Sequence, residues 1–221
     1  LYGVAGYGGS ENKGTVFRME TDGSGFAVLH HFAGGGTDGA NPYGSLVLAD
    51  DYLYGLTSAG GDLNRGTAFK VKTDGTVFSL LHEFAGGTSD GRYPSGSLAL
   101  SGATLCGMTP NGGDNDYAGT VFKLQADGSG YALLHEFAGG VDDGYQPWGD
   151  VIISGPTLYG MTTGGGDSNM GVVFSLGSSS LVGNILSGLS LTYMRAFRIG
   201  DRVRIGEAEG DVVGRSMLTV R

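Results

Sequence analysis

Three histidines recur at equivalent places in the chain and are the first residues whose type suggests chemistry. His30, His82 and His135 each follow a leucine, and a glutamate stands beside His82 and His135. Imidazole can serve as a general base or as a metal ligand. A catalytic site, however, gathers different residue types at one place, whereas these histidines return once per repeat. Each shares a strand face with a phenylalanine, which favours a core or interstrand hydrogen-bonding role. A ring of imidazoles that lines a channel and binds transition metals is the alternative.

Acidic loops follow each of these histidine strands. Carboxylates in such loops could supply oxygen ligands to calcium. None of the loops has the alternating run of carboxylates typical of a dedicated calcium site, and Asp-Gly is also a common turn sequence. The sequence therefore predicts turns here and no metal site. The loops are Thr37-Asp38-Gly39, Ser89-Asp90-Gly91 and Asp142-Asp143-Gly144.

Aromatic side chains next to loop prolines are the remaining ligand candidates. Tyr43, Tyr93 and Trp148 each adjoin a proline. Exposed rings in loops could form a platform on which a carbohydrate stacks, and a protein ligand could use the same surface. Packing between repeats would explain them equally well, because aromatic rings gain much from burial.

No sequence pattern predicts catalysis. The chain has no GxSxG, HExxH or phosphate-loop motif, so we expect no catalytic residue, no cofactor and no enzymatic activity. The single cysteine, Cys106, rules out an intrachain disulfide and is expected to be a small buried apolar side chain. A net charge of −9 makes nucleic acid an unfavourable partner.

A repeat of about 52 residues organises most of the chain. Leu-Tyr-Gly begins at residues 1, 53 and 158, and Leu-Cys-Gly at 105; a glycine doublet and then Gly-Thr-Val-Phe or a close variant follow in register. Three complete copies and the opening of a fourth are present. Because the chain opens inside a repeat, we expect it to be a fragment.

Each copy reads as four short antiparallel strands. Thr67, Phe69 and Val71 alternate with Ala68 and Lys70, the pattern of a strand with one buried face. An Asp-Gly pair then supplies the positive φ angles of a tight hairpin turn, at residues 22–23, 74–75 and 127–128. This predicts an all-β, kelch-like β-propeller-type repeat with three full blades and a partial fourth. So few blades cannot close a ring, so either blades precede residue 1 or the repeats form an open array.

The repeats resemble a known family. The strings LYGxTxxGG, GTVFKLxxDGSG and LLHEFAGGxxDG are similar to the GloVer (Gloeo/Verruco) tandem repeat of bacterial secreted and surface proteins, over residues 1–176. The resemblance implies a propeller-like domain located outside the cytoplasm or at the cell surface. It implies no activity.

The tail departs from the repeat. Six of the 13 Lys and Arg residues lie after residue 177, and residues 178–194 carry no charge. The pattern predicts a tandem β-repeat domain over 1–177, an amphipathic or membrane-associated helix over 178–195, and the start of a small β domain over 196–221 with a β-hairpin. Small residues four apart suit helix contacts in a membrane, yet the apolar stretch is short for a crossing. An ordinary soluble helix and hairpin is the alternative.

This tail resembles the small-conductance mechanosensitive channel family through the string GNILSGLSLTYMRAFRIGDRVRIGEAEGDVV. The resemblance implies a helix that packs on a small β domain, and it implies membrane association and a homo-oligomer formed through residues 178–221. The channel family's upstream membrane helices are replaced by repeats, so the junction near residue 177 is either natural or an assembly fusion. The positions carried over are Gly183, Asn184 and Gly188 on the helix, Phe197, Gly200, Asp201 and Gly206 at the helix-to-sheet junction, and Gly210 in the next turn.

Two functions follow from these patterns. The first is a non-enzymatic extracytoplasmic module for binding or scaffolding, joined to a channel-like fragment. The second is a membrane protein of the mechanosensitive channel family that carries the repeats as an appended domain and transports ions across the membrane.

Overall fold

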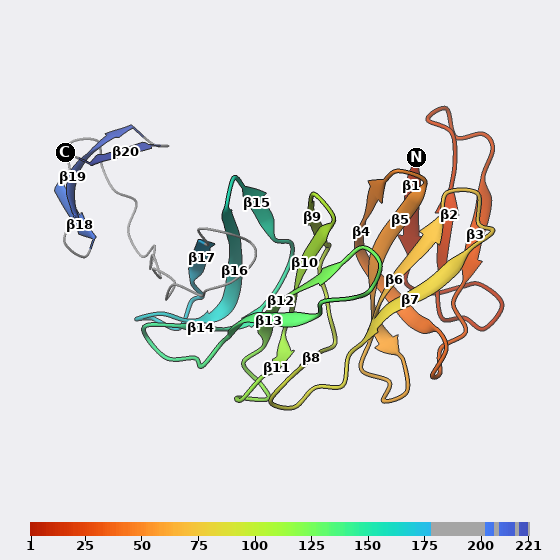
Figure 1. Ribbon diagram of the computed structural model, residues 1–221, viewed down its shortest axis with the longest axis horizontal. Helices are drawn as coiled ribbons and strands as arrows, with labels where there is room; N and C mark the ends of the chain where they lie inside the picture. Colours follow the sequence, from red (N-terminus) through yellow and green to blue (C-terminus); the bar gives the residue numbers. More distant parts are fainter. Residues whose placement is uncertain (178–201, 206–207, 215–216, 221) are drawn as a thin grey trace.

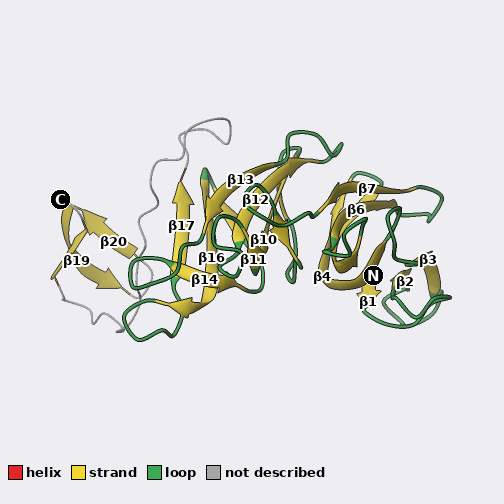
Figure 2. Cartoon of the chain, turned by 90° about the horizontal axis from the view of Figure 1, so that it is seen from below, coloured by secondary structure: helices red, strands yellow, loops and turns green. Residues whose placement is uncertain are grey.

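In the computed structural model, residues 1–177, 202–205, 208–214 and 217–220 are described. All of this part is strand, turn and loop, as Figure 2 shows, so the all-β prediction is confirmed. The predicted helix over 178–195 lies outside the described residues.

Residues 1–177 form four antiparallel sheets of three or four strands in chain order (Figure 1), and a separate two-stranded pair, which we group with sheet 3. Sheet 1 contains β1 (Tyr2–Ala5), β2 (Thr15–Arg18) and β3 (Ala27–His31). Sheet 2 is the meander β4 (Gly39–Ala49), β5 (Tyr52–Gly60), β6 (Thr67–Lys72) and β7 (Phe78–Glu83).

Sheets 3 and 4 repeat this meander with an interrupted first strand. In sheet 3, β8 (Gly91–Arg92) pairs with β11 (Asn111–Gly112), while β9 (Ala99–Ser101), β10 (Thr104–Thr109), β12 (Thr120–Gln125) and β13 (Ala132–Glu136) form the main body. In sheet 4, β14 (Gly144–Pro147) and β15 (Ile152–Ser154) pair along one edge of β16 (Thr157–Gly165), and β17 (Val173–Gly177) pairs along the other.

The sheets are displaced by one strand from the sequence copies. A copy begins at its Leu-Tyr-Gly strand, but a sheet begins one strand earlier, at the Asp-Gly loop. Residues 1–177 therefore hold two complete meanders flanked by sheets that lack one strand each, and the prediction of three full blades is wrong in this respect. A repeat pattern fixes the period but not its starting point. In the described part, strand pairing closes no ring or barrel.

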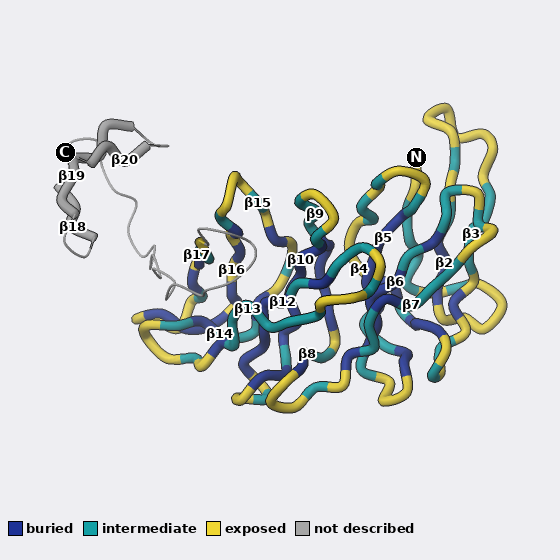
Figure 3. The backbone as a smooth tube through the Cα atoms, viewed as in Figure 1, coloured by how far each residue is buried: buried dark blue, intermediate teal, exposed yellow. Residues whose placement is uncertain are grey.

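Sheets 2 and 3 are buried on both faces, which corrects the expectation of strands with one buried face. In β6, Phe69 and Val71 join a core with sheet 1, while Ala68 joins a core with sheet 3. Ala68 is as fully buried as Phe69. Figure 3 shows this concentration of buried backbone in the central strands. The cause is that sheets 2 and 3 each stack between two other sheets. Alternate residues of one strand point to opposite faces and therefore belong to different cores.

The hairpin turns form at the predicted places, but only the glycine of each Asp-Gly pair has a positive φ angle. Gly75 has a φ of +79°, and its amide donates to the Lys72 carbonyl over 2.8 Å. Asp74 is not in the left-handed region. Its side chain instead accepts a hydrogen bond from the Thr76 amide over 2.9 Å, so the aspartate stabilises the turn as a local acceptor.

The glycine of each Leu-Tyr-Gly or Leu-Cys-Gly strand makes room for a phenylalanine on the neighbouring strand. Gly107 pairs with Phe122, and a Cβ at Gly107 would lie 2.6 Å from Phe122 Cζ and 3.1 Å from Leu98 Cδ2. Phe122 is fully buried. The ring therefore has no space to move away, and only glycine fits beneath it.

We expect Gly107→Ala to lower the free energy of unfolding by about 1–3 kcal/mol, the usual cost of overpacking a core. Denaturant unfolding would measure this. Phe122→Leu shortens the side chain above the glycine, so adding Gly107→Ala to Phe122→Leu should cost less than adding it to the original chain. Equal costs in both backgrounds would contradict this steric account.

The C-terminal strands form a separate antiparallel sheet of β18 (Arg202–Ile205), β19 (Ala208–Gly214) and β20 (Met217–Val220). The predicted hairpin is β18–β19. Gly210 was predicted to lie in a turn. It lies instead inside β19, where it pairs with Val203 and Val220. The other positions assigned to the tail lie outside the described residues: Gly183, Asn184, Gly188, Phe197, Gly200, Asp201 and Gly206.

Candidate functional site

Each recurring histidine pairs with the aspartate of the loop that follows it. The Nε2 atoms of His30 and His82 each lie 3.1 Å from a carboxylate oxygen, of Asp38 and Asp90 respectively. His135 Nε2 lies 3.3 Å from Asp143 Oδ1. The hydrogen-bonding role expected for the histidines is therefore present, although the partner belongs to a loop and not to a neighbouring strand.

Two of the histidine rings also stack on the following sheet. His30 lies parallel to Phe78 with ring centroids 3.8 Å apart, and His82 lies parallel to Tyr131 at 3.7 Å. The edge of a phenylalanine two residues later contacts each histidine, as Phe84 does for His82. His30 and His82 are thus each held between two aromatic rings at a sheet junction, where they stabilise the stacking of the repeats.

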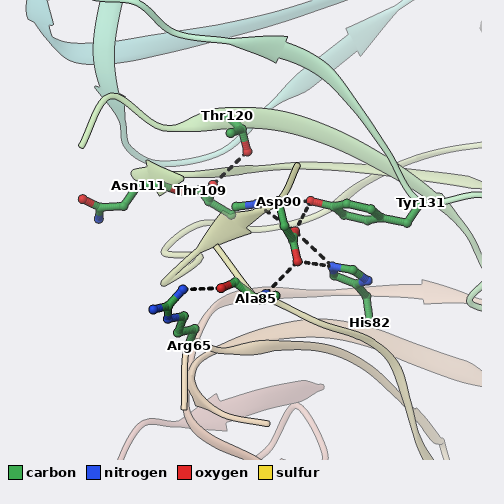
Figure 4. A network of polar contacts seen from close by, with 9 residues as sticks. Arg65, His82, Ala85, Asp90, Thr109, Asn111, Thr120 and Tyr131 are labelled. Atoms are coloured by element: carbon green, nitrogen blue, oxygen red, sulfur yellow. Dashed lines mark hydrogen bonds and ion pairs between the residues drawn. The ribbon is translucent and has the colours of Figure 1, made fainter. Parts of the chain in front are cut away.

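The aspartates of the acidic loops organise the loops themselves. Asp90 Oδ2 accepts the Ala85 amide over 2.7 Å, and Oδ1 accepts the Gly91 amide over 2.7 Å. Tyr131, from the next repeat unit, donates its hydroxyl to the same carboxylate (Figure 4). These bonds occupy the oxygens that a calcium ion would require. Within the described residues, no three His, Cys, Asp or Glu side chains gather closely enough to hold a metal ion.

Hydrogen bonding outweighs burial at Asp90. Burial alone would raise the pKa of this carboxyl, but hydrogen bonds from His82, Tyr131 and the Ala85 amide hold the pKa below its ordinary value. The same balance, with His135 and the Ala138 amide as donors, lowers the pKa of Asp143. Burial, together with Asp90, raises the pKa of Tyr131, so this hydroxyl remains protonated and donates.

The lowered pKa of Asp90 predicts a loss of stability in acid. Its contribution is fully present above the ordinary carboxyl pKa of about 4 and disappears as pH falls through the lower pKa of the folded state. Denaturant unfolding should therefore give a smaller free energy of unfolding at about pH 3 than at neutral pH, and Asp90→Asn should reduce that difference. An identical pH dependence in Asp90→Asn would contradict the assignment.

The structure brings two of the three predicted aromatic residues together. Tyr43 and Trp148 are half-exposed, and their rings meet edge to face with centroids 6.5 Å apart and planes at 77°. Both side chains directly follow the proline of their repeats. Tyr93 precedes its proline and lies elsewhere, with the Arg92 guanidinium 5.5 Å from its ring centroid. The aromatic pair, Tyr43 and Trp148, is the candidate ligand site of this chain.

A stack of loop backbones positions the aromatic pair. The segments that follow the prolines of sheets 2, 3 and 4 lie against one another: a Cβ on Gly44 would lie 2.6 Å from the Gly96 carbonyl oxygen, and a Cβ on Gly96 would overlap the carbonyl oxygen of Gly149. The Ser45 amide donates to Ser97 Oγ over 2.7 Å, and the Ser97 amide donates to Asp150 Oδ1 over 2.7 Å. Ser45, Ser97 and Asp150 occupy the same position in successive repeats, and their hydrogen bonds connect three sheets. We call these bonds the Ser45–Ser97–Asp150 relay. It holds two rings from distant parts of the sequence beside each other.

The prolines themselves close the sheet junctions. A Cβ on Gly66 would lie 2.7 Å from Pro94 Cδ of the next sheet, and the residue before the proline, Tyr93, has a φ of +58° and donates its amide to the Arg65 carbonyl over 2.7 Å. Sequence reasoning identified the prolines but not this inter-sheet contact. The signal was present, because the equivalents of Gly66 and Pro94 recur together in every complete copy.

Cys106 is fully buried, as expected, and burial raises the pKa of its thiol to about 11. The thiol is therefore protonated at neutral pH and is a poor nucleophile. It packs with Met108 and Phe174 between sheets 3 and 4.

Two families match different parts of the chain. The Gloeobacter/Verrucomicrobia repeat matches residues 1–198, and the mechanosensitive ion channel β domain matches residues 180–221. Mechanosensitive ion channel protein 1, mitochondrial, of Arabidopsis thaliana is 37% identical over 49 residues, which is 22% of this chain and 10% of that protein. This chain therefore spans a small part of that relative. Among the described residues, no helix has the length and apolar character needed to cross a membrane.

Several solved structures share a general likeness. TolB from Acinetobacter baumannii has a TM-score of 0.48 and 13% identity, covering 95% of this chain and 50% of that one. A nidogen/laminin complex gives 0.43 and 13%, covering 76% and 70%. A 6-phosphogluconolactonase-like protein from Bacteroides fragilis gives 0.38 and 16%, covering 98% and 79%.

Proposed function

We propose that this chain, which belongs to the Gloeobacter/Verrucomicrobia repeat family, is a non-enzymatic glycan-binding module whose ligand stacks on Tyr43 and Trp148. Residues 1–177 act as a segment of a β-propeller, located outside the cytoplasm or at the cell surface. The repeats supply a rigid frame, and loops at the sheet junctions supply the binding surface.

The observation that carries this proposal is the geometry of the aromatic pair. The two rings are half-exposed and their planes meet at 77°, so the edge of one ring lies beside the face of the other. A sugar presents apolar C–H groups on the face of its ring, which stack on such a surface, and hydroxyl groups around its rim. Asp150, two residues after Trp148 in the sequence, is exposed, and its carboxylate can accept bonds from such hydroxyls.

Fixed position distinguishes this pair from an incidental surface contact. The Ser45–Ser97–Asp150 relay immobilises the loops, so little conformational freedom is lost when a ligand binds. The stacked antiparallel sheets, two of which are complete four-stranded meanders, support the propeller part of the proposal, because a four-stranded meander is the repeating unit of a propeller.

Retention on immobilised polysaccharides tests this function. We expect the full chain to be retained on at least one neutral polysaccharide, such as a glucan, a mannan or chitin, and Trp148→Ala to elute with the unbound fraction. Tyr7→Ala is the matched control, because Tyr7 is an exposed aromatic residue outside the pair. Elution of the unaltered chain with the unbound fraction on every matrix would contradict the proposal, as would equal retention of Trp148→Ala.

The match of residues 180–221 favours a second function. We propose, as the alternative, that the chain is part of a membrane protein of the small-conductance mechanosensitive channel family, which carries the repeats as an appended domain and forms homo-oligomers through residues 178–221. The three-stranded sheet β18–β20 supports this alternative, because the matched family segment is itself a β domain.

Membrane retention separates this alternative from the first function. If the tail inserts, the full chain will remain in membranes after alkaline carbonate washing, while a chain that ends at Gly177 will be released. Release of both chains would contradict the proposal that the tail inserts in a membrane.

A further inference from the structure

One end of sheet 3 carries a group of polar and aromatic side chains around Arg92. Arg92 ends β8, which pairs with β11, and the loop between β11 and β12 follows β11 directly (Figure 1). Sheet 3 packs on sheet 2 with one face and on sheet 4 with the other. The exposure of these side chains therefore does not depend on what lies before residue 1 or after residue 177. We call four side chains the Arg92 cluster: Arg92, Tyr93, Asp116 and Tyr117.

Arg92 holds the other members of the cluster in place. Its guanidinium carbon lies 5.5 Å from the ring centroid of Tyr93 and 5.5 Å from that of Tyr117, within the range of a cation–π interaction. Arg92 Nη2 also lies 2.8 Å from Asp116 Oδ2. The Arg92 side chain is only 14% exposed, whereas Tyr93 and Tyr117 are 40% and 69% exposed. A largely buried cation thus supports two tyrosine rings that remain in contact with water.

The repeat fold does not require this cluster. Arg92 occupies the position that Ala40 occupies in sheet 2. Tyr117 belongs to the loop over residues 113–119, which is one residue longer than the equivalent loop over residues 61–66. Insertions in repeat proteins fall in loops on one face, which is often the binding face. Because the other sheets stack without such a cluster, its side chains indicate a role other than stacking.

The backbone at Tyr93 supports the same interpretation. Tyr93 has a φ of +58°, in the left-handed region that a large side chain enters at a cost. Its equivalent in sheet 2, Asn41, has a φ of +54°, and asparagine tolerates this region well. Asparagine would therefore fit the backbone at position 93 at lower cost. A strained residue with an exposed ring is typical of binding sites, where such strain is concentrated.

We propose that the Arg92 cluster is a second glycan site, which binds a neutral sugar residue on the exposed surfaces of Tyr93 and Tyr117. The C–H groups of the sugar stack on the tyrosine rings. The Asp116 carboxylate is 43% exposed and accepts hydrogen bonds from the sugar hydroxyls. Arg92 is a positioning residue, because it fixes the two rings and the carboxylate relative to one another.

Charge favours a neutral ligand over an anionic one. Asp116 neutralises the charge of Arg92, and the whole chain carries a net charge of −9. An anion therefore gains no attraction at this end of sheet 3. The Arg92 cluster extends the proposed function to a second place on the chain. It shares no residue with the aromatic pair, so either site can exist without the other.

Two weak sites on one chain bind an immobilised polysaccharide together, because the second contact forms at a high effective concentration. The loss of either site then suffices for early elution. We therefore expect Tyr117→Ala, like Trp148→Ala, to elute with the unbound fraction. Tyr117 is exposed in a loop, so its replacement should not unfold the chain.

Two-dimensional NMR of the isotope-labelled full chain would observe the two sites separately. The backbone amides of residues 115–118 report on the Arg92 cluster, and the indole N–H of Trp148 reports on the aromatic pair. Oligosaccharides of glucose, mannose and N-acetylglucosamine are the probes. We expect saturable shifts at both reporters with at least one of them. Tyr117→Ala should raise the apparent Kd at the Arg92 cluster at least about tenfold and leave the Kd at Trp148 unchanged.

Two further variants test how the cluster works. Arg92→Lys keeps the charge but loses the flat guanidinium that contacts both rings, so it should also raise the Kd at the Arg92 cluster alone. A general loss of folding would change both sites, which separates the positioning role from a purely structural one. Leu63→Ala is the matched control, because Leu63 is an exposed residue of the equivalent loop in sheet 2. It should leave both Kd values unchanged.

The pattern of shifts decides between the two sites. Shifts at Trp148 without shifts at residues 115–118 would overturn the second site and leave the proposed function intact. Shifts at residues 115–118 alone would support the second site and contradict binding at the aromatic pair. A Kd at the Arg92 cluster that Tyr117→Ala leaves unchanged would also overturn this inference.

Discussion

Asp90→Ala is expected to lower the free energy of unfolding by about 3–5 kcal/mol, the cost of removing one member of a buried, hydrogen-bonded charged group. The substitution deprives His82, Tyr131 and the amides of Ala85 and Gly91 of their shared acceptor. The Asp90 and His82 side chains are only 9% and 19% exposed, so water replaces the lost partner incompletely. Denaturant unfolding monitored by circular dichroism would measure the loss.

Asp127→Ala is the matched control for this prediction. Asp127 also stands before a glycine and also accepts from a nearby amide, that of Ser129 over 2.9 Å, but it is exposed in a hairpin turn. Its removal should cost no more than about 1 kcal/mol, because water can satisfy the freed donors. Similar losses for both variants would show that Asp90 serves only as a turn residue.

Gly96→Ala is expected to have the second-largest effect, because a methyl group there would overlap the backbone of Gly149. Backbone atoms cannot move aside as the tip of a side chain can. We therefore expect the free energy of unfolding to fall by about 1–3 kcal/mol or more. We expect the segment that bears Trp148 to move as well, which would disturb its contact with Tyr43. The same variant should therefore lose retention on the polysaccharide that holds the unaltered chain.

Gly6→Ala controls for the intrinsic effect of replacing a glycine. A Cβ at Gly6 would lie 3.5 Å from the Pro42 carbonyl oxygen, which is ordinary contact, and Gly6 is not in the left-handed region. Gly6→Ala should leave stability nearly unchanged. If Gly96→Ala behaves in the same way, the close approach of the loops cannot be what positions the aromatic pair.

The sequence was sufficient to predict the period, the strands and the turns, because these depend on local patterns. Thr67, Phe69 and Val71 alternate as a strand should, and Asp74-Gly75 turns where it was expected to. Two-sided burial of Ala68 was not predicted, since it arises from the stacking of one repeat on another. Alanine is small enough to suit either a buried or an exposed position, so its type gives no signal.

The candidate site was predicted in part for the same reason. Tyr43 and Trp148 were recognised as exposed loop aromatics, but their contact depends on how sheets 2, 3 and 4 are arranged in space. Tyr131 was missed because its acceptor, Asp90, lies in another repeat. Its place was nevertheless marked, since an aromatic residue recurs there as Phe26 and Phe78.

Titration of Trp148 fluorescence with oligosaccharides tests the central claim most directly, because Trp148 is the only tryptophan in the chain. Oligosaccharides of glucose, mannose and N-acetylglucosamine would each be added to the full chain. We expect a saturable change in emission with at least one of them, and an apparent Kd at least about tenfold higher in Tyr43→Ala, which loses one stacking surface. Tyr7→Ala should titrate like the unaltered chain. Emission that stays constant with every sugar, or a Kd that Tyr43→Ala leaves unchanged, would contradict a glycan site at the aromatic pair.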